Sequence, residues 1–247
     1  MTMDPLAREC CRGDATASRP ATLRHALLVA APPLSFSLLL TVLAYAAAQL
    51  SLGLFLAPLG IVAIIGPSLA LAPRAWIDRF IAVGALLLPI LVIWLVPVFQ
   101  SPVAIGEYLR ACLLLGSFTF AIVSLAWAMH RLLSSPALAA AIVLVLSVAW
   151  LSWAIWAAKY LAGDERAALV DKLIWAHPVF SMNGLLRIPF PVPWVQYKFA
   201  YMHTNIGQDI PFELPGSVWP CVVLHVAIGG VLLLASVVQR RQTAVDK

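Results

Sequence analysis

The amino-acid sequence predicts an all-α integral membrane protein with six transmembrane helices and with both termini in the cytoplasm. Two observations carry this prediction. The composition is too apolar for a soluble domain, and six apolar stretches of about 20 residues recur along the chain. The distribution of arginine and lysine among the connecting loops sets the orientation. Between the fifth and sixth helices, the sequence predicts a long outer segment of short re-entrant or interfacial helices.

The composition excludes several classes of protein. Of the 247 residues, 62% are hydrophobic and only 11% are charged, whereas a soluble domain is about half apolar and roughly a quarter charged. A soluble domain of this length needs a polar surface that such a composition cannot supply. The sequence therefore excludes a soluble enzyme and a nucleic-acid-binding domain. Arginines at membrane borders explain the net charge of +5.

Six apolar stretches are long enough to cross a bilayer as helices, because a helix rises ~1.5 Å per residue and the hydrocarbon core is ~30 Å thick. They lack the alternation of apolar and polar residues that a barrel strand requires. The predicted spans are Ala26–Ala48, Leu52–Ala72, Phe80–Phe99, Ala111–Met129, Ala137–Ala158 and Val218–Val238.

Basic residues gather on the side that we assign to the cytoplasm. The segments predicted there contain Arg8, Arg12, Arg19, Arg24, Arg74, Arg79, Arg131, Arg240, Arg241 and Lys247. The short outer loops contain only Arg110, in agreement with the rule that cytoplasmic loops are positively charged. The predicted organisation is a cytoplasmic tail over 1–25, helices 1–5 over 26–158, an outer segment over 159–217, helix 6 over 218–238 and a cytoplasmic tail over 239–247.

The outer segment has the composition of the membrane interface. Residues 164–176 predict a short amphipathic helix with Ala168, Leu169, Leu173 and Ile174 on its apolar side. Prolines then recur, which excludes a long helix or a central strand. Aromatic residues, which favour the membrane–water boundary, are dense from here to the last span: Trp175, Phe180, Phe190, Trp194, Tyr197, Phe199, Tyr201, Phe212 and Trp219.

The interiors of the six predicted spans contain no Asp, Glu, Lys or Arg. Ion-coupled transporters and proton relays need such residues inside the membrane, so the sequence argues against a transporter that draws on an ion gradient. The chain also lacks the HExxH, GxSxG and GxxxxGK[ST] motifs. We therefore expect no enzyme activity and no cofactor in this chain; if ATP drives its function, a partner subunit binds and hydrolyses it.

Histidine and cysteine leave two alternatives open on the predicted outer side. His177, His203 and His225 could bind a transition metal or haem, but their spacing matches no ligand motif, and structural roles are favoured. Cys112 and Cys221 lie at predicted outer ends of spans, where an oxidising compartment permits a disulfide. Two separate thiols are the favoured alternative.

The turn between the second and third predicted spans, residues 72–79, has the composition of a short interfacial helix. Pro73 suits a first helical turn, Trp76 and Ile77 form an apolar side, and Arg74, Asp78 and Arg79 are expected to face water or a partner. The turn is either an interfacial anchor or an element that docks on another protein.

This layout resembles the permease subunits of type-2 ATP-binding-cassette (ABC) exporters. The resemblance covers nearly the whole chain and includes the sequence from His177 and Pro178 to Asn183 and Gly184, which is similar to the motif that introduces the outer re-entrant helices of that family. It implies that Arg74, Trp76, Ile77, Asp78 and Arg79 belong to a coupling helix that seats on a separate ATPase subunit. It also implies a homodimer or paired permease in the plasma membrane, in bacteria the inner membrane.

The leading hypothesis is therefore a multi-pass permease subunit of an ATP-driven exporter, which forms the substrate path among membrane lipids. An uncharged bundle suits a lipid-like or amphipathic cargo, because a buried charge would have no partner. The alternative is a non-transporting membrane scaffold or assembly factor that binds a partner protein through its outer aromatic loop. A membrane enzyme or a metal or haem handler that uses the outer histidines is a third hypothesis.

Overall fold

The computed structural model describes residues 28–39, 42, 53–71, 76–100, 104–161, 166–186 and 214–245. Every regular element within these residues is helical. The elements are a helix over Leu28–Leu39, α2 (Gly53–Leu71), α3 (Trp76–Ile93), α4 (Leu95–Gln100), α5 (Ile105–Leu133), α6 (Pro136–Trp156), α7 (Ala158–Leu161), α8 (Ala167–Ala176), α9 (Pro178–Leu186) and α11 (Trp219–Val245). The prediction of an all-α protein is confirmed for this part of the chain.

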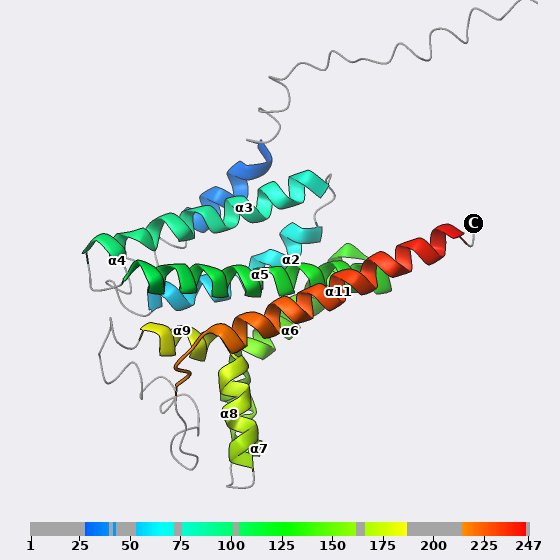
Figure 1. The fold of residues 1–247 in the computed structure, drawn as a ribbon. Helices are drawn as coiled ribbons and strands as arrows, with labels where there is room; N and C mark the ends of the chain where they lie inside the picture. The colour runs from blue at the N-terminus through cyan, green and yellow to red at the C-terminus, as the bar shows by residue number, and fades with distance from the viewer. Residues whose placement is uncertain are drawn as a thin grey trace, which may run out of the picture.

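Helix α5 is the centre of the bundle. It packs against α2, α6, α9 and α11, and α2 also packs against α3 and α6. The ends of α2, α5 and α11 and the beginning of α3 lie at one end of the bundle (Figure 1). The short helices α4 and α9 and the beginning of α11 lie at the other end, where α8 stands across the direction of the long helices (Figure 1).

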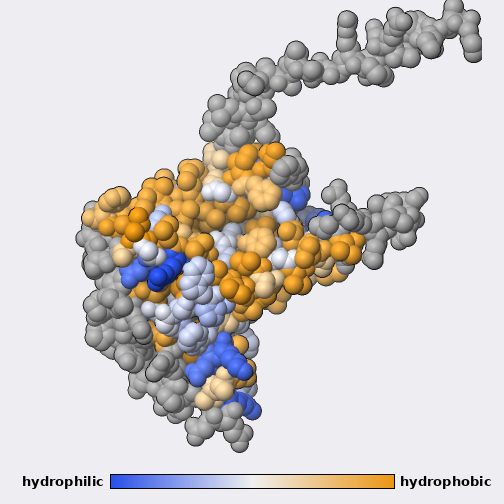
Figure 2. Space-filling view, viewed as in Figure 1, coloured by the Kyte–Doolittle hydropathy of each residue, from blue (hydrophilic) through white to orange (hydrophobic). Residues whose placement is uncertain are grey.

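Among the described residues, four helices are long and apolar enough to cross a membrane: α2 over Leu54–Leu71, α5, α6, and α11 over Trp219–Ser236. This architecture is consistent with an α-helical membrane protein. Within these windows 61% of α2 is buried, against 28% of α6 and of α11, so α2 lies inside the bundle while α6 and α11 lie at its edge. Hydrophobic surface covers most of the long helices in Figure 2, and hydrophilic surface is limited to separate patches near the beginning of α5, near the beginning of α3 and at α8.

The third predicted span differs from the structure, and the first is described only in part. Only Leu28–Leu39 of the predicted Ala26–Ala48 lies in a described helix, so this crossing, and with it the total of six, stays a prediction. The third span divides at Trp94 into α3 and α4. Pro97 explains the division, since a proline lacks the N–H that would bond the carbonyl four residues earlier, at Ile93.

Helix α5 is longer than the predicted Ala111–Met129. At its beginning, the Ala104 N–H donates to a carboxylate oxygen of Glu107 at 3.0 Å, which satisfies one of the free donors of a helix start. At its end, Ser134 has a φ of 56° and its N–H donates to the His130 carbonyl at 2.9 Å. Helix α6 then begins at Pro136, so α5 and α6 are joined by a turn of two residues.

Helix α8 matches the predicted amphipathic helix in place but not in its apolar side. Val170 and Ile174 are fully buried, four residues apart as one face of a helix requires. Leu169, which the sequence placed on the apolar side, is 49% exposed. The buried face of α8 therefore differs from the predicted apolar side. Packing against α9 and α11 decides which side of the helix is covered.

A buried tryptophan repairs a backbone defect in α2. Pro58 has no N–H, so the carbonyl of Leu54, four residues earlier, has no donor within its own helix. The Nε1–H of Trp94 donates to that carbonyl at 3.0 Å, and the Trp94 side chain is fully buried. The indole also packs against Phe55, with 5.0 Å between the ring centroids. The break between α3 and α4 therefore lies where a side chain can reach α2.

The pairing of Trp94 with the Pro58 defect predicts non-additive mutations. Trp94→Phe should lower the free energy of unfolding by about 1–3 kcal/mol, because it leaves the Leu54 carbonyl without a donor. The smaller side chain also leaves a cavity, and the cost of this cavity should be the same whether residue 58 is Pro or Ala. In Pro58→Ala the helix regains an N–H, so Trp94→Phe should cost measurably less there. Thermal unfolding of the four purified proteins in detergent measures the difference. Equal costs in both backgrounds would contradict this account.

Candidate functional site

The predicted coupling residues do not form one exposed face. Arg74 lies outside the described residues, and Trp76 is the first residue of α3. Ile77 is 51% exposed, whereas Asp78 is buried. Asp78 was expected to face water or a partner; its burial in the first turn of α3 suits a carboxylate, because the free N–H groups at a helix start favour negative charge.

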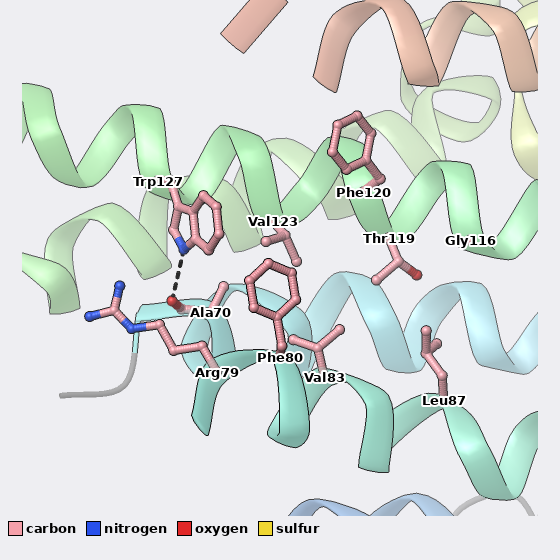
Figure 3. Close-up of a pocket in the computed structure, with 10 residues that line it drawn as sticks. All are labelled: Ala70, Arg79, Phe80, Val83, Leu87, Gly116, Thr119, Phe120, Val123 and Trp127. Atoms are coloured by element: carbon pink, nitrogen blue, oxygen red, sulfur yellow. Dashed lines mark hydrogen bonds between the residues drawn. The ribbon is translucent and has the colours of Figure 1, made fainter. Parts of the chain in front are cut away.

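Arg79 lies at the edge of a pocket that sequence reasoning missed. The pocket has a volume of about 180 Å³ and lies between α2, α3 and α5. Arg79 and Trp127 stand at one end of it, and Leu87 and Gly116 stand at the other (Figure 3). Apart from Arg79 and Thr119, all the side chains around it are apolar: Ala70, Phe80, Val83, Leu87, Phe120, Val123 and Trp127, with Gly116.

Trp127 fixes the end of this pocket where Arg79 lies. Its Nε1–H donates to the carbonyl of Ala70 at 3.1 Å (Figure 3). Ala70 is in the last turn of α2, where carbonyls have no helical donor. The edge of the Phe80 ring also meets the indole, with the centroids 5.9 Å apart at 86°. The end of α2, the beginning of α3 and the last turns of α5 are therefore held together by one side chain.

The sequence did contain a signal for the α5 side of the pocket. Gly116, Phe120, Val123 and Trp127 recur at intervals of four, three and four residues, which places them on one face of a helix. This spacing is common to every packed helix, so it does not by itself indicate a pocket. Arg79 did not indicate a pocket either, because arginines are common beside short loops at the cytoplasmic border of membrane helices.

The outer-segment motif forms a buried junction between α8 and α9. His177 separates the two helices and is 1% exposed. Its Nε2–H donates to the Trp150 carbonyl of α6 at 2.9 Å. The imidazole is packed among aromatic rings, with centroids 5.3 Å from Trp150, 6.1 Å from Trp153 and 5.2 Å from Phe180. Burial lowers the pKa of His177 to about 3, so the ring is neutral at physiological pH.

Pro178, Asn183 and Gly184 give α9 its place in the bundle. Pro178 is the first residue of α9, where a missing N–H costs nothing. Asn183 is buried, and α9 packs against α5, α2 and α8. Gly184 allows the closest approach, since a Cβ at this position would lie 2.2 Å from the carbonyl oxygen of Pro215. The motif residues are therefore brought together as a packing element.

Polar side chains of α11 complete the junction. Cys221 is buried, and its thiol donates to the Ala176 carbonyl at the end of α8, with 3.1 Å between sulfur and oxygen. His225 donates from Nδ1 to the Cys221 carbonyl at 2.7 Å. Cys112 and Cys221 are free thiols, so the favoured alternative of two separate thiols is confirmed.

Metal binding at the histidines receives no support from the part of the chain that the structure describes. Within those residues, no group of three His, Cys, Asp or Glu side chains is placed to hold a metal ion. His203 lies outside the described residues. The nitrogens of His177 and His225 that have partners donate to carbonyls, which is a structural use of the ring.

No protein-family profile, curated protein or solved structure matches this chain. Its function has to be argued from its own residues.

Gly184→Ala should destabilise the protein by about 1–3 kcal/mol, the usual cost of overpacking, because the new methyl group would collide with backbone at Pro215. Thermal unfolding of the detergent-purified variant measures this. Gly60→Ala in α2 is the matched control: a Cβ there has nothing within 4 Å, so the change should be neutral or stabilising. Equal melting temperatures for the two variants would contradict the close approach.

His177 should make the protein less stable in mild acid. Its pKa is about 3 when folded and about 6.5 when unfolded. Between these values the unfolded state binds one more proton, so the free energy of unfolding falls by about 1.4 kcal/mol for each pH unit below 6.5. His177→Gln keeps an N–H for the Trp150 carbonyl but does not titrate. Between pH 7 and pH 5 the variant should lose about 2 kcal/mol less than the natural chain; identical pH profiles would contradict the prediction.

Proposed function

We propose that this chain is the transmembrane permease subunit of an ATP-driven ABC exporter, which forms the substrate path and couples to a separate ATPase subunit. The observation that carries the proposal is the placement of two features at opposite ends of the bundle. The end of α2 and the beginning of α3 lie at one end, and the short buried helix α9 with the crosswise helix α8 lies at the other (Figure 1). A permease of this kind needs a contact for the ATPase at one end and a closure of the path at the other.

Ile77 is the described residue that best suits a contact with an ATPase. It is an exposed apolar side chain in the first turn of α3, beside the α2–α3 connection. Exposed apolar anchors of this kind carry much of the binding energy in protein interfaces. Asp78 is buried and Arg79 lines the pocket, so neither offers an exposed apolar contact of this kind.

Exposed apolar faces on the edge helices support a pairing of two permease copies or a boundary with membrane lipids. They bear the side chains Val145, Leu146, Val148 and Ile155 on α6 and Val223, Val226, Ile228, Val231 and Leu234 on α11. A multi-pass location in the plasma membrane, six crossings and cytoplasmic termini belong to the same proposal. The cargo that fits it is lipid-like or amphipathic, because the helices that the structure describes bury almost no charge.

The alternative, a non-transporting scaffold or assembly factor, has one observation in its favour. Trp175 and Trp219, on either side of the outer aromatic loop, are 41% and 52% exposed, as the anchors of a binding surface would be. Deletion of Phe190–Tyr201 distinguishes the two functions. A scaffold loses its partner protein, whereas an exporter subunit keeps its ATPase.

An ATPase should co-purify with the intact chain in mild detergent, and a charge at Ile77 should release it. Ile77→Asp places a carboxylate on the proposed contact, while Ile105→Asp makes the same change at the other end of the bundle, where Ile105 is 67% exposed and begins α5. Both new residues stand in a first helical turn, which tolerates Asp. Mass spectrometry should find an ABC-type ATPase with the natural chain and with Ile105→Asp. The amount of ATPase recovered with Ile77→Asp should be at least about tenfold lower.

Two outcomes would count against the proposal. If no ATPase accompanies the natural chain from the cells that produce it, the chain is not a permease of this class. If the ATPase binds equally to both variants, the contact does not lie at the beginning of α3.

A further inference from the structure

The pocket between α2, α3 and α5 combines an apolar wall with a single cation among the described residues. Apart from Arg79, the polar side chain at the pocket is Thr119. The Thr119 hydroxyl donates to the Leu115 carbonyl of its own helix at 2.7 Å, so its proton is already used. A ligand would therefore meet hydrocarbon along the pocket and a guanidinium at one end (Figure 3).

Arg79 has unused hydrogen-bonding capacity. Its Nε is buried and has no hydrogen-bond partner among the described residues. A buried donor without an acceptor is costly, and more so when it is charged. The neighbouring Asp78 projects from a different side of α3, because consecutive helical residues do not face each other. An anionic group at the pocket would accept from the guanidinium with the short, often paired hydrogen bonds typical of arginine.

The size and opening of the pocket indicate what kind of molecule would carry this anionic group. A volume of about 180 Å³ is below the ~300–1,000 Å³ of sites that enclose a whole drug-sized molecule, yet above the ~150 Å³ of an apolar cavity that binds benzene. It takes a segment of one acyl chain. Of the lining side chains, Phe80 is 56% exposed and Phe120 is 37% exposed, so the remainder of the ligand would lie on an apolar outer surface.

We propose that this pocket, called here the Arg79 pocket, binds an anionic phospholipid from the surrounding bilayer. One acyl chain lies over Phe80, Val83 and Leu87, and the phosphate accepts hydrogen bonds from Arg79. Arg79 is the fourth residue of α3, near the helix end where a headgroup resides. Basic pockets between membrane helices are a known way of holding anionic headgroups. The proposal depends on the membrane location and is independent of the proposed transport function.

Native mass spectrometry of the intact chain, released from detergent, tests the headgroup. The probes are phosphatidylglycerol, phosphatidylcholine with the same acyl chains, and palmitate. The natural chain should retain phosphatidylglycerol in preference to phosphatidylcholine. Arg79→Gln should bind phosphatidylglycerol about tenfold more weakly, the usual effect of losing one charge-assisted contact. The control is Arg131→Gln, which removes an exposed arginine in the last turn of α5 at the same end of the bundle and should bind like the natural chain.

A second pair of variants tests the chain-binding part of the pocket. Gly116 lines the pocket, and a Cβ there has nothing within 4 Å. Gly116→Leu should therefore fill the pocket without moving the backbone, and it favours the helix by about 1 kcal/mol. Gly84→Leu makes the same change at a position with equal space that does not line the pocket. Retention of phosphatidylglycerol should fall about tenfold in Gly116→Leu only.

Several results would overturn the assignment. Equal retention of phosphatidylglycerol and phosphatidylcholine by the natural chain would remove the role of charge, and unchanged binding in Arg79→Gln would remove this arginine. Unchanged binding in Gly116→Leu would place the lipid elsewhere. Tighter retention of palmitate than of phosphatidylglycerol would make the occupant a free fatty acid. The control for unfolding is the melting temperature of each of the four variants. If it stays close to that of the natural chain, the losses of lipid do not come from unfolding.

Discussion

Backbone carbonyls that lose their helical donors decide how this bundle is assembled. Inside an apolar bundle such a carbonyl has no water to accept from, so another part of the protein has to donate. Pro58 creates this need at Leu54, and Trp94 meets it. The last turn of α2 creates it at Ala70, and Trp127 meets it. Both donors come from outside α2, so Pro58 and the end of α2, which weaken that helix alone, bind the α3–α4 junction and α5 to it.

The same requirement shapes the other end of the molecule. The carbonyls at the end of α8 accept from Cys221 of α11 and from Ser181 of α9, and the Trp150 carbonyl of α6 accepts from His177. The junction thus joins four helices through side-chain donors of moderate polarity, and none of these contacts needs a formal charge. His177, which is neutral because it is buried among aromatic rings, can donate to the Trp150 carbonyl without a charge. The motif from His177 to Gly184 therefore serves as a packing element in the described part of the chain.

The sequence predicts the positions of the helices better than the contacts between them. The apolar runs predicted α2 and α6 closely, and they predicted the beginning of α11, which continues to Val245 beyond the predicted end at Val238. The division of the third span follows from Pro97 once the lost hydrogen bond to Ile93 is considered. The extension of α5 to Ile105 depended on Glu107, a residue that also reads as a loop carboxylate. The pocket stayed hidden for a different reason. Its residues come from three helices, and neither the spacing on α5 nor a border arginine indicates which helices will meet.

Phe120 links the pocket to the last helix. It lines the pocket from α5, and it also covers Gly229 of α11, where a Cβ would lie 2.5 Å from the Cδ1 of its ring. Because Gly229 has no side chain, the backbone of α11 lies directly against this ring. A larger residue at position 229 would have to displace the ring, which would also change the wall of the pocket. The Phe120 side chain is therefore shared between the pocket and the contact of α5 with α11.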